Sequence, residues 1–152
     1  MCPLHRLTST SESPPSEPGT YILVFSVKEE MTVPVGKLGT LALQPGTYAY
    51  VGSAHGPGGL AARVRRHLRP HKRVHWHIDY VTAHISPTEV RYVTGKEDLE
   101  CIWVRELLHH PGTVVPLIGM GNGDCKAGCP AHFLRISSQT VLDELEDKGA
   151  LP

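Results

Sequence analysis

Arg63 and His67 stand four residues apart, in a segment (59–68) whose leucine and valine residues recur at helical spacing. In a helix, residues four apart lie on one face, so both side chains would point the same way. The planar guanidinium of arginine matches the geometry of a phosphate group and can stabilise negative charge on it. The pair therefore suits phosphodiester chemistry, although a solvated basic helix with a surface arginine explains the same pattern.

A second group, His75-Trp76-His77-Ile78-Asp79, places two histidines on either side of an aromatic residue. Such a group could bind a metal or stack on a nucleobase. Histidines two residues apart share a face only in a strand, whereas we predict a helix over 75–83. Packing of the aromatic ring, with one hydrogen bond between Asp79 and a histidine, explains the group equally well.

Acidic residues follow in a segment predicted to be a helix over 97–109: Glu97, Asp98, Glu100 and Glu106. Metal-assisted cleavage of a phosphate ester needs at least one carboxylate to hold a divalent ion. Acids in the first turn of a helix are common for dipole reasons alone. Glu100 differs because apolar neighbours would draw it partly into the core, where a carboxylate needs a partner or an ion.

Cys125, Cys129 and His132 lie close together in the sequence, and Cys101 lies further away. Three thiols and an imidazole could hold zinc in a tetrahedral site. The spacing matches no standard zinc finger or ribbon, so buried free cysteines or a redox pair are alternatives.

The net charge of the 152-residue chain is zero, yet no acidic residue occurs between Glu30 and Asp79. That span carries seven lysines and arginines, so one face of the molecule should be basic and could contact a phosphate backbone. The residues predicted to contact nucleic acid are Arg65, Arg66, Arg69, Lys72, Arg73, His75 and His77.

Apolar runs and turn signals give the outline of the fold. We predict strands at 21–27, 32–35, 38–43, 47–51, 89–94, 114–118 and 132–136, and helices at 59–68, 75–83, 97–109 and 138–145. The first four strands should form an antiparallel meander over 19–52. The predicted fold class is α/β (α+β), with a small antiparallel β-sheet core flanked by helices.

Residues 1–18 are rich in serine and proline and are predicted to be a disordered N-terminal tail before a single domain over 19–150. The tail lacks the apolar run of a signal peptide, and no stretch is long enough to span a bilayer. We therefore expect no membrane partner and a cytoplasmic location, in which the cysteines are thiols or metal ligands.

Taken in order, these motifs resemble the GIY-YIG nuclease superfamily. One strand opens with Gly19-Thr20-Tyr21, a later strand ends with Tyr50-Val51-Gly52, and two helices carry Arg63 and His67, then Glu100. The branch that is most similar is that of the small stand-alone Uri-type endonucleases, echoed by GTYILV, GTYAYVGSA, GLAARVRRHLR, HWHIDY, Glu100-Cys101 and GDC…C…HF. The resemblance covers about residues 19–136.

The resemblance implies a role for each site residue. Tyr21 would orient or deprotonate the attacking water, and Tyr50 would hydrogen-bond the phosphate or support Tyr21. Arg63 would stabilise the pentacovalent phosphorane, and His67 would assist proton transfer or contact the phosphate. Glu100 would bind one Mg²⁺ or Mn²⁺, which would neutralise charge on the leaving oxygen.

Thr20 stands where the superfamily name has isoleucine, and the asparagine that family members often carry after the glutamate helix would be Asn122 or Asp124 here. The resemblance as a whole predicts a metal-dependent endonuclease whose partner is DNA, with single-stranded or branched DNA among the candidate substrates. Two other hypotheses stay open: a nucleic-acid-binding module that has lost cleavage, and a zinc-stabilised protein whose basic loop binds a protein partner.

Overall fold

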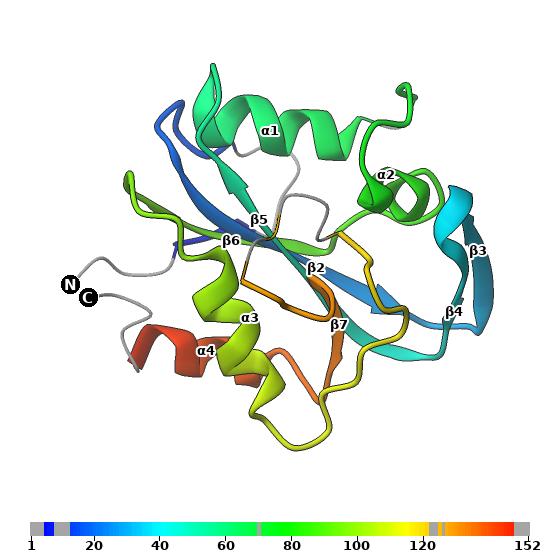
Figure 1. Cartoon of the computed structure of the whole chain (residues 1–152). Coiled ribbons are helices and arrows are strands. Elements are labelled where there is room, and N and C mark those ends of the chain that lie inside the picture. Colours follow the sequence, from blue (N-terminus) through cyan, green and yellow to red (C-terminus); the bar gives the residue numbers. More distant parts are fainter. Residues whose placement is uncertain (1–4, 8–12, 70, 122–124, 126, 148–152) are drawn as a thin grey trace.

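The computed structural model describes residues 5–7, 13–69, 71–121, 125 and 127–147 (Figure 1). Its central sheet has the strand order β1-β6-β2-β5-β7, and every neighbouring pair is antiparallel. The strands are β1 (His5–Leu7), β2 (Gly19–Val27), β5 (Gly46–Ala54), β6 (Glu89–Thr94) and β7 (Phe133–Ile136). The helices are α1 (Gly59–Leu68), α2 (His77–Thr82), α3 (Glu100–Leu108) and α4 (Thr140–Asp147).

The sheet separates two layers of helices. Figure 1 shows α1 and α2 on one face and α3 and α4 on the other. Alternate residues of β2 serve the two layers, because successive side chains of a strand point to opposite faces. Tyr21, Leu23 and Phe25 pack towards α1 and α2, whereas Ile22 and Val24 pack towards α3 and α4. The continuous apolar run of β2 is therefore explained by burial on both faces, and the predicted fold class is confirmed.

The strands β3 (Met31–Val35) and β4 (Gly39–Leu43) form a separate two-stranded sheet, joined through a short 3₁₀ helix at Gly36–Leu38. The predicted meander over 19–52 is therefore wrong in its pairing, because β2 pairs with β5 and β6 instead of β3. The alternate apolar residues of this hairpin face the core beside α2, which accounts for its departure from the main sheet: Val33, Val35, Leu41 and Leu43.

The segment 1–18 also differs from the predicted disordered tail where the structure describes it. Residues 5–7 form β1 along β6, and Arg6 donates a hydrogen bond to the buried Glu89. The carbonyls of Pro15 and Glu17 accept hydrogen bonds from Ala61 and Leu60 in the first turn of α1. Backbone carbonyls of a polar segment can thus satisfy the free N–H groups of a helix, which composition alone does not show.

Two other predicted elements are corrected. Only Val114 of the predicted strand 114–118 makes a β-bridge, to Arg135, and the rest of that segment is turns and bends. Helix α3 begins at Glu100 instead of residue 97, and the Asp98 carboxylate accepts a hydrogen bond from the Glu100 N–H. Aspartate that bonds the backbone in this way favours the boundary of a helix over its interior.

Within the part of the chain that the structure describes, none of the helices combines the length and the apolar character needed to cross a membrane.

Candidate active site and metal centre

A cavity of about 610 Å³ lies where β5, α1, the segment before α2 and the start of α3 meet. Its walls carry one tyrosine, one arginine, two histidines and two carboxylates, so polar groups of several kinds converge on one space. The lining residues are Tyr50, Gly52, Ser53, Arg63, His75, Trp76, His77, Asp98, Glu100, Cys101, Gly121, Cys125 and Ala127. The structure thus brings together residues that lie more than 70 positions apart in the sequence.

Arg63 is held in place at the edge of this cavity. Its Nη1 donates to the carbonyl of Ser53 at 3.1 Å, and its guanidinium carbon lies 4.4 Å from the centre of the Trp76 ring. A cation over an aromatic ring is stabilised by the quadrupole of the ring. Arg63 also makes a side-chain hydrogen bond with Tyr21, so the guanidinium is fixed between β5, Trp76 and the tyrosine hydroxyl while it lines the cavity.

Asp79 organises the segment that carries Trp76. Its side chain is fully buried and accepts two hydrogen bonds from Arg66, each at 2.9 Å. It also accepts the backbone N–H groups of His75 and Trp76. Burial opposes ionisation, but these bonds lower the pKa of Asp79. The predicted hydrogen bond between Asp79 and a histidine is present, and it comes from the backbone N–H of His75, as expected for an acid in the first turn of α2.

Tyr21 and His67 form a buried pair behind the cavity wall. The Tyr21 hydroxyl lies 2.6 Å from His67 Nε2, and both side chains are at most 1% exposed. Burial raises the pKa of Tyr21 well above its usual range and lowers the pKa of His67 to about 3. The resting pair is therefore neutral, and one hydrogen bond joins the Tyr21 hydroxyl to His67 Nε2. Neither Tyr21 nor His67 lines the cavity, whereas Tyr50 does.

Gly52 explains how Tyr21 reaches this position. The two residues are cross-strand partners in β2 and β5, and a Cβ built on Gly52 would lie 2.6 Å from the Tyr21 hydroxyl oxygen. Any larger residue at 52 would displace the hydroxyl. Because Gly52 lines the cavity, the Tyr21 hydroxyl lies directly behind that part of its wall.

The residues predicted to contact nucleic acid divide into two sets. Arg66 and Lys72 make internal contacts: Arg66 bonds Asp79, and the Lys72 ammonium donates to two carbonyls at the end of α1. His77 Nδ1 accepts the N–H of Gly121 at 3.1 Å. The exposed members, whose side chains face solvent, are Arg65, Arg69, Arg73 and His75.

Of the four candidate carboxylates, Asp98 and Glu100 line the cavity, whereas Glu97 and Glu106 do not. Both carboxylates thus offer the cavity oxygen atoms, the type of ligand that Mg²⁺ and Mn²⁺ prefer. Asn122 and Asp124, named as candidates to complete the site, lie outside the described residues.

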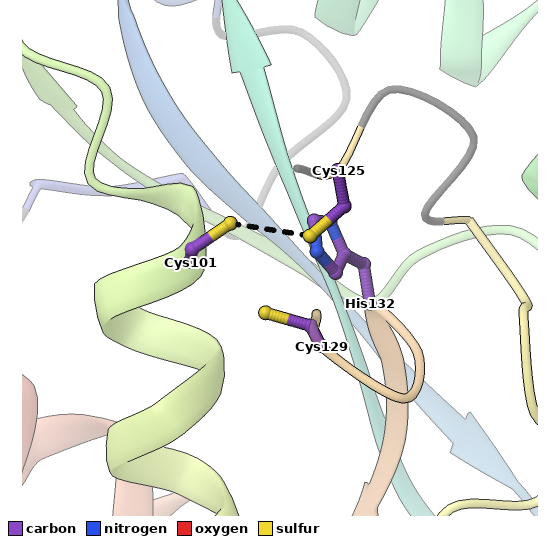
Figure 2. Close-up of side chains that lie close together, drawn as sticks. All are labelled: Cys101, Cys125, Cys129 and His132. Atoms are coloured by element: carbon purple, nitrogen blue, oxygen red, sulfur yellow. Dashed lines mark hydrogen bonds between the residues drawn. The ribbon is translucent and has the colours of Figure 1, made fainter. Parts of the chain in front are cut away.

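Cys101, Cys125, Cys129 and His132 converge into one cluster next to the cavity (Figure 2). Their candidate ligand atoms all lie within 4.8 Å of one another, and Cys101 Sγ lies 3.5 Å from Cys125 Sγ. Four ligands around zinc at about 2.3 Å would be about 3.8 Å apart, so the cluster has nearly the size of a tetrahedral site. A Cys3His cluster that could hold a metal ion is therefore present.

Protonation in this cluster is uneven. Burial raises the pKa of Cys101 to about 12. Burial also acts on Cys125, but hydrogen bonds from the backbone N–H groups of Cys129 and Ala127 lower its pKa to about 6. A thiolate is the form of cysteine that binds metal, and the lowered pKa favours this form at Cys125.

His132 links the cluster to the cavity. Its side chain is fully buried, and its Nδ1 contacts Glu100 Oε2. The ring also makes a side-chain hydrogen bond with Cys125, so His132 contacts both the cavity carboxylate and the thiols of the cluster. Sequence reasoning listed Glu100 and His132 for different metals and missed this contact, since 32 residues separate them and no periodic pattern connects them.

A family model described as "Domain of unknown function DUF123" matches residues 20–150. A comparison with curated proteins and a comparison with solved structures gave no significant match.

Proposed function

The chain belongs to the DUF123 family, and we propose that it is a metal-dependent endonuclease that hydrolyses DNA phosphodiester bonds. The observation that carries this proposal is the convergence of Tyr50, Arg63 and Glu100 on one cavity from β5, α1 and α3. The resemblance of the sequence to GIY-YIG nucleases supports the same assignment, because its motif residues lie in the cavity wall or directly behind it.

The site residues suit the charge that develops during phosphoryl transfer. Arg63 would contact the non-bridging oxygens of the phosphate, since it is already fixed by Ser53 and Trp76. Tyr50 would donate its hydroxyl hydrogen to the same phosphate. Its pKa is raised, chiefly by burial, so the hydroxyl stays a donor at neutral pH.

The Tyr21–His67 pair is the candidate for removing a proton from the attacking water. The water would give a proton to the Tyr21 oxygen while the hydroxyl proton of Tyr21 passes to His67 Nε2, which lies 2.6 Å away. One O–H bond breaks in the water and one in Tyr21, and one O–H and one N–H bond form.

Glu100, with Asp98 beside it, would hold Mg²⁺ or Mn²⁺, and the bound ion would supply neutralisation of charge on the leaving oxygen. The exposed cations of α1 and the following segment would contact the DNA backbone, since such contacts need charge and no particular base. They are Arg65, Arg69 and Arg73.

We propose zinc as the ion of the Cys3His cluster, with a role in folding instead of catalysis. Three sulfurs and one nitrogen are the ligands that zinc prefers, and four protein ligands leave no open position for substrate. A centre of this kind requires reduced thiols, which agrees with a cytoplasmic location.

The test is a cleavage assay with the zinc-loaded full chain on single-stranded, duplex and branched DNA. Mg²⁺ or Mn²⁺ is added or omitted; a strong chelator such as EDTA is avoided, because it would also strip the Cys3His cluster. We expect cleavage only with the divalent ion, and loss of about 10²- to 10³-fold in kcat for Arg63→Ala. Glu100→Ala should raise the divalent ion concentration needed for cleavage.

Arg65→Ala is the matched control, because Arg65 lies on the same helix but is exposed and does not line the cavity. It should reduce the salt dependence of DNA binding and leave kcat nearly unchanged. Equal cleavage by wild type, Arg63→Ala and Glu100→Ala, or none under any condition, would refute the proposal. Binding to DNA without cleavage would favour the non-catalytic binding module.

A further inference from the structure

The carboxylate of Glu100 stands at the border of two sites. It lines the cavity, where its side chain is 19% exposed, and its Oε2 contacts Nδ1 of the fully buried His132. His132 in turn belongs to the Cys3His cluster. The Glu100 carboxylate therefore contacts a ligand of the Cys3His cluster and also lines the cavity, whose wall includes Cys101 and Cys125 of that cluster.

A histidine that binds a metal does so through one ring nitrogen and donates the N–H of the other to a nearby acceptor. In this protein Nδ1 is directed to Glu100, which leaves Nε2 as the nitrogen for the metal. The ring also makes a side-chain hydrogen bond with Cys125, so it lies against the thiols of the cluster, and a neutral ring with Nε2 on an ion would satisfy both of its nitrogens.

We propose that Glu100 is the carboxylate that supports His132 in the Cys3His centre, and that the centre in return fixes the orientation of Glu100 in the cavity. His132 is then a positioning residue for the Glu100 carboxylate. The first half of this proposal stands on the contact between the two residues. The second half rests on the proposed function, because it concerns the carboxylate as a ligand for the divalent ion.

The backbone supports the same coupling. Cys101 follows Glu100 directly in the first turn of α3, so an ion on Cys101 would hold the backbone of Glu100 while His132 holds its side chain. The Asp98 carboxylate accepts the N–H of Glu100 at 3.0 Å and adds a third constraint. Of these three constraints on Glu100, those through Cys101 and His132 would depend on a bound metal ion, whereas the hydrogen bond to Asp98 would not.

The first experiment measures metal affinity directly. The centre is loaded with Co²⁺, whose absorption reports thiolate bonding and tetrahedral geometry, and a chelator competes for the ion. We expect Glu100→Ala to lower the affinity for Co²⁺ by about 10- to 100-fold with an unchanged spectrum, because all four ligands remain. Glu100→Gln should lose less, since its amide oxygen still accepts the Nδ1 hydrogen.

Glu106→Ala is the control, because Glu106 lies on the same helix but outside the cavity and the cluster. Its affinity for Co²⁺ should equal that of the wild type. If Glu100→Ala also binds Co²⁺ within about twofold of the wild type, the proposal is overturned, because support by a carboxylate normally contributes at least about tenfold.

The second experiment tests whether the centre positions Glu100. His132→Cys would replace the imidazole by a fourth thiolate, so the chain keeps a closed zinc site but loses the N–H that holds Glu100. Mn²⁺ binding to the zinc-loaded proteins is followed by electron paramagnetic resonance. We expect His132→Cys to bind Mn²⁺ about tenfold more weakly than the wild type, and Glu100→Ala to bind it weaker still.

Unchanged Mn²⁺ affinity in zinc-loaded His132→Cys would overturn the positioning role, and the Co²⁺ spectrum of the same variant checks that its centre is formed. The outcomes separate the two proposals. A weaker Co²⁺ affinity in Glu100→Ala without any DNA cleavage by the wild type would refute the nuclease and keep the shared carboxylate. Cleavage by a wild type whose Co²⁺ affinity does not depend on Glu100 would do the reverse.

Discussion

The two walls of the cavity are stabilised in different ways. The α1 wall, defined by Arg63, Arg66, Trp76 and Asp79, has polar groups that satisfy one another through hydrogen bonds and ring contacts. The α3 wall, defined by Glu100, Cys101, Cys125, Cys129 and His132, gathers three thiols and an imidazole around a common centre. The first wall is complete with the chain alone, whereas the second has the composition of a site that an ion completes.

The two walls therefore position their charged groups by different means: the α1 wall by hydrogen bonds within the chain, and the α3 wall by a cluster that would need an ion. The buried Asp79 carboxylate accepts the Trp76 N–H, and the Trp76 ring lies against Arg63, the cation that would meet phosphate. The carboxylate that would meet the divalent ion is fixed through His132 instead. Changes to the two walls should therefore respond differently to zinc.

Removal of zinc should have the largest effect. With free zinc at a thousand times its Kd, the bound ion adds about 4 kcal/mol to the free energy of unfolding. Hydrogen exchange should accelerate at the start of α3 and in residues 127–132, and much less in α1 and α2. Comparable acceleration in both walls would show that the α1 wall also depends on the ion.

Asp79→Ala should be next, with a loss of about 3 kcal/mol in the free energy of unfolding, because Arg66 loses its buried partner and two backbone N–H groups lose their acceptor. Urea denaturation of zinc-loaded protein measures it. Glu97→Ala, which removes an exposed acid, should stay within about 0.5 kcal/mol of the wild type. A loss that disappears when zinc is removed would contradict the independence of the α1 wall.

Acid should weaken the packing of α1 through the buried His67, which lies on the same helix as Arg63 and Arg66. The pKa of His67 is about 3 in the folded chain and about 6.5 in an unfolded one, so between these values the unfolded state binds a proton that the folded state does not. The free energy of unfolding therefore decreases as the pH is lowered, by about 2 kcal/mol between pH 6.5 and pH 5. His67→Gln should lack this component. Comparing zinc-loaded wild type and variant cancels the protonation of the zinc ligands, and parallel pH profiles would exclude the assignment.

Lys72→Met should have the smallest effect. The Lys72 ammonium donates to the carbonyls of His67 and Arg69 at the end of α1, where the helix dipole also favours a cation. Its loss should lower the free energy of unfolding by about 1 kcal/mol, measured in urea. Lys96→Met, at an exposed position, serves as the reference and should change stability by less than about 0.5 kcal/mol.

The periodicity of apolar residues predicted most of the helices and strands, but it did not predict which strands pair with each other. The bounds of α1 and β6 agree with the predicted 59–68 and 89–94, because an apolar stripe or run is a local property. The pairing of β2 with β5 and β6 depends on how the β3–β4 hairpin packs, which no local pattern contains. The predicted strand 114–118 was apolar but includes Pro116, and only Val114 forms a bridge.

The site shows the same division. Donor chemistry alone grouped the three cysteines with His132, and the structure brings those four together. Donor chemistry could not reveal that His67 is buried against Tyr21, or that Arg66 and Lys72 make hydrogen bonds within the chain. Those facts depend on which face of α1 meets the sheet, and arginine and lysine look alike in sequence whether they meet solvent or a buried carboxylate.

Glu100 and Cys101, consecutive residues at the first turn of α3, place an oxygen donor and a sulfur donor next to each other in the cavity wall, and the sulfur also belongs to the Cys3His cluster. Ligand softness differs sharply between these donors, so a hard ion such as Mg²⁺ favours one side and a soft ion such as zinc favours the other. In a mixture of cations, Mg²⁺ would therefore bind at the Glu100 oxygen and zinc at the Cys101 sulfur, although the two residues are consecutive. Cadmium, which is softer still, should exchange into the thiolate side and leave the oxygen side free for magnesium.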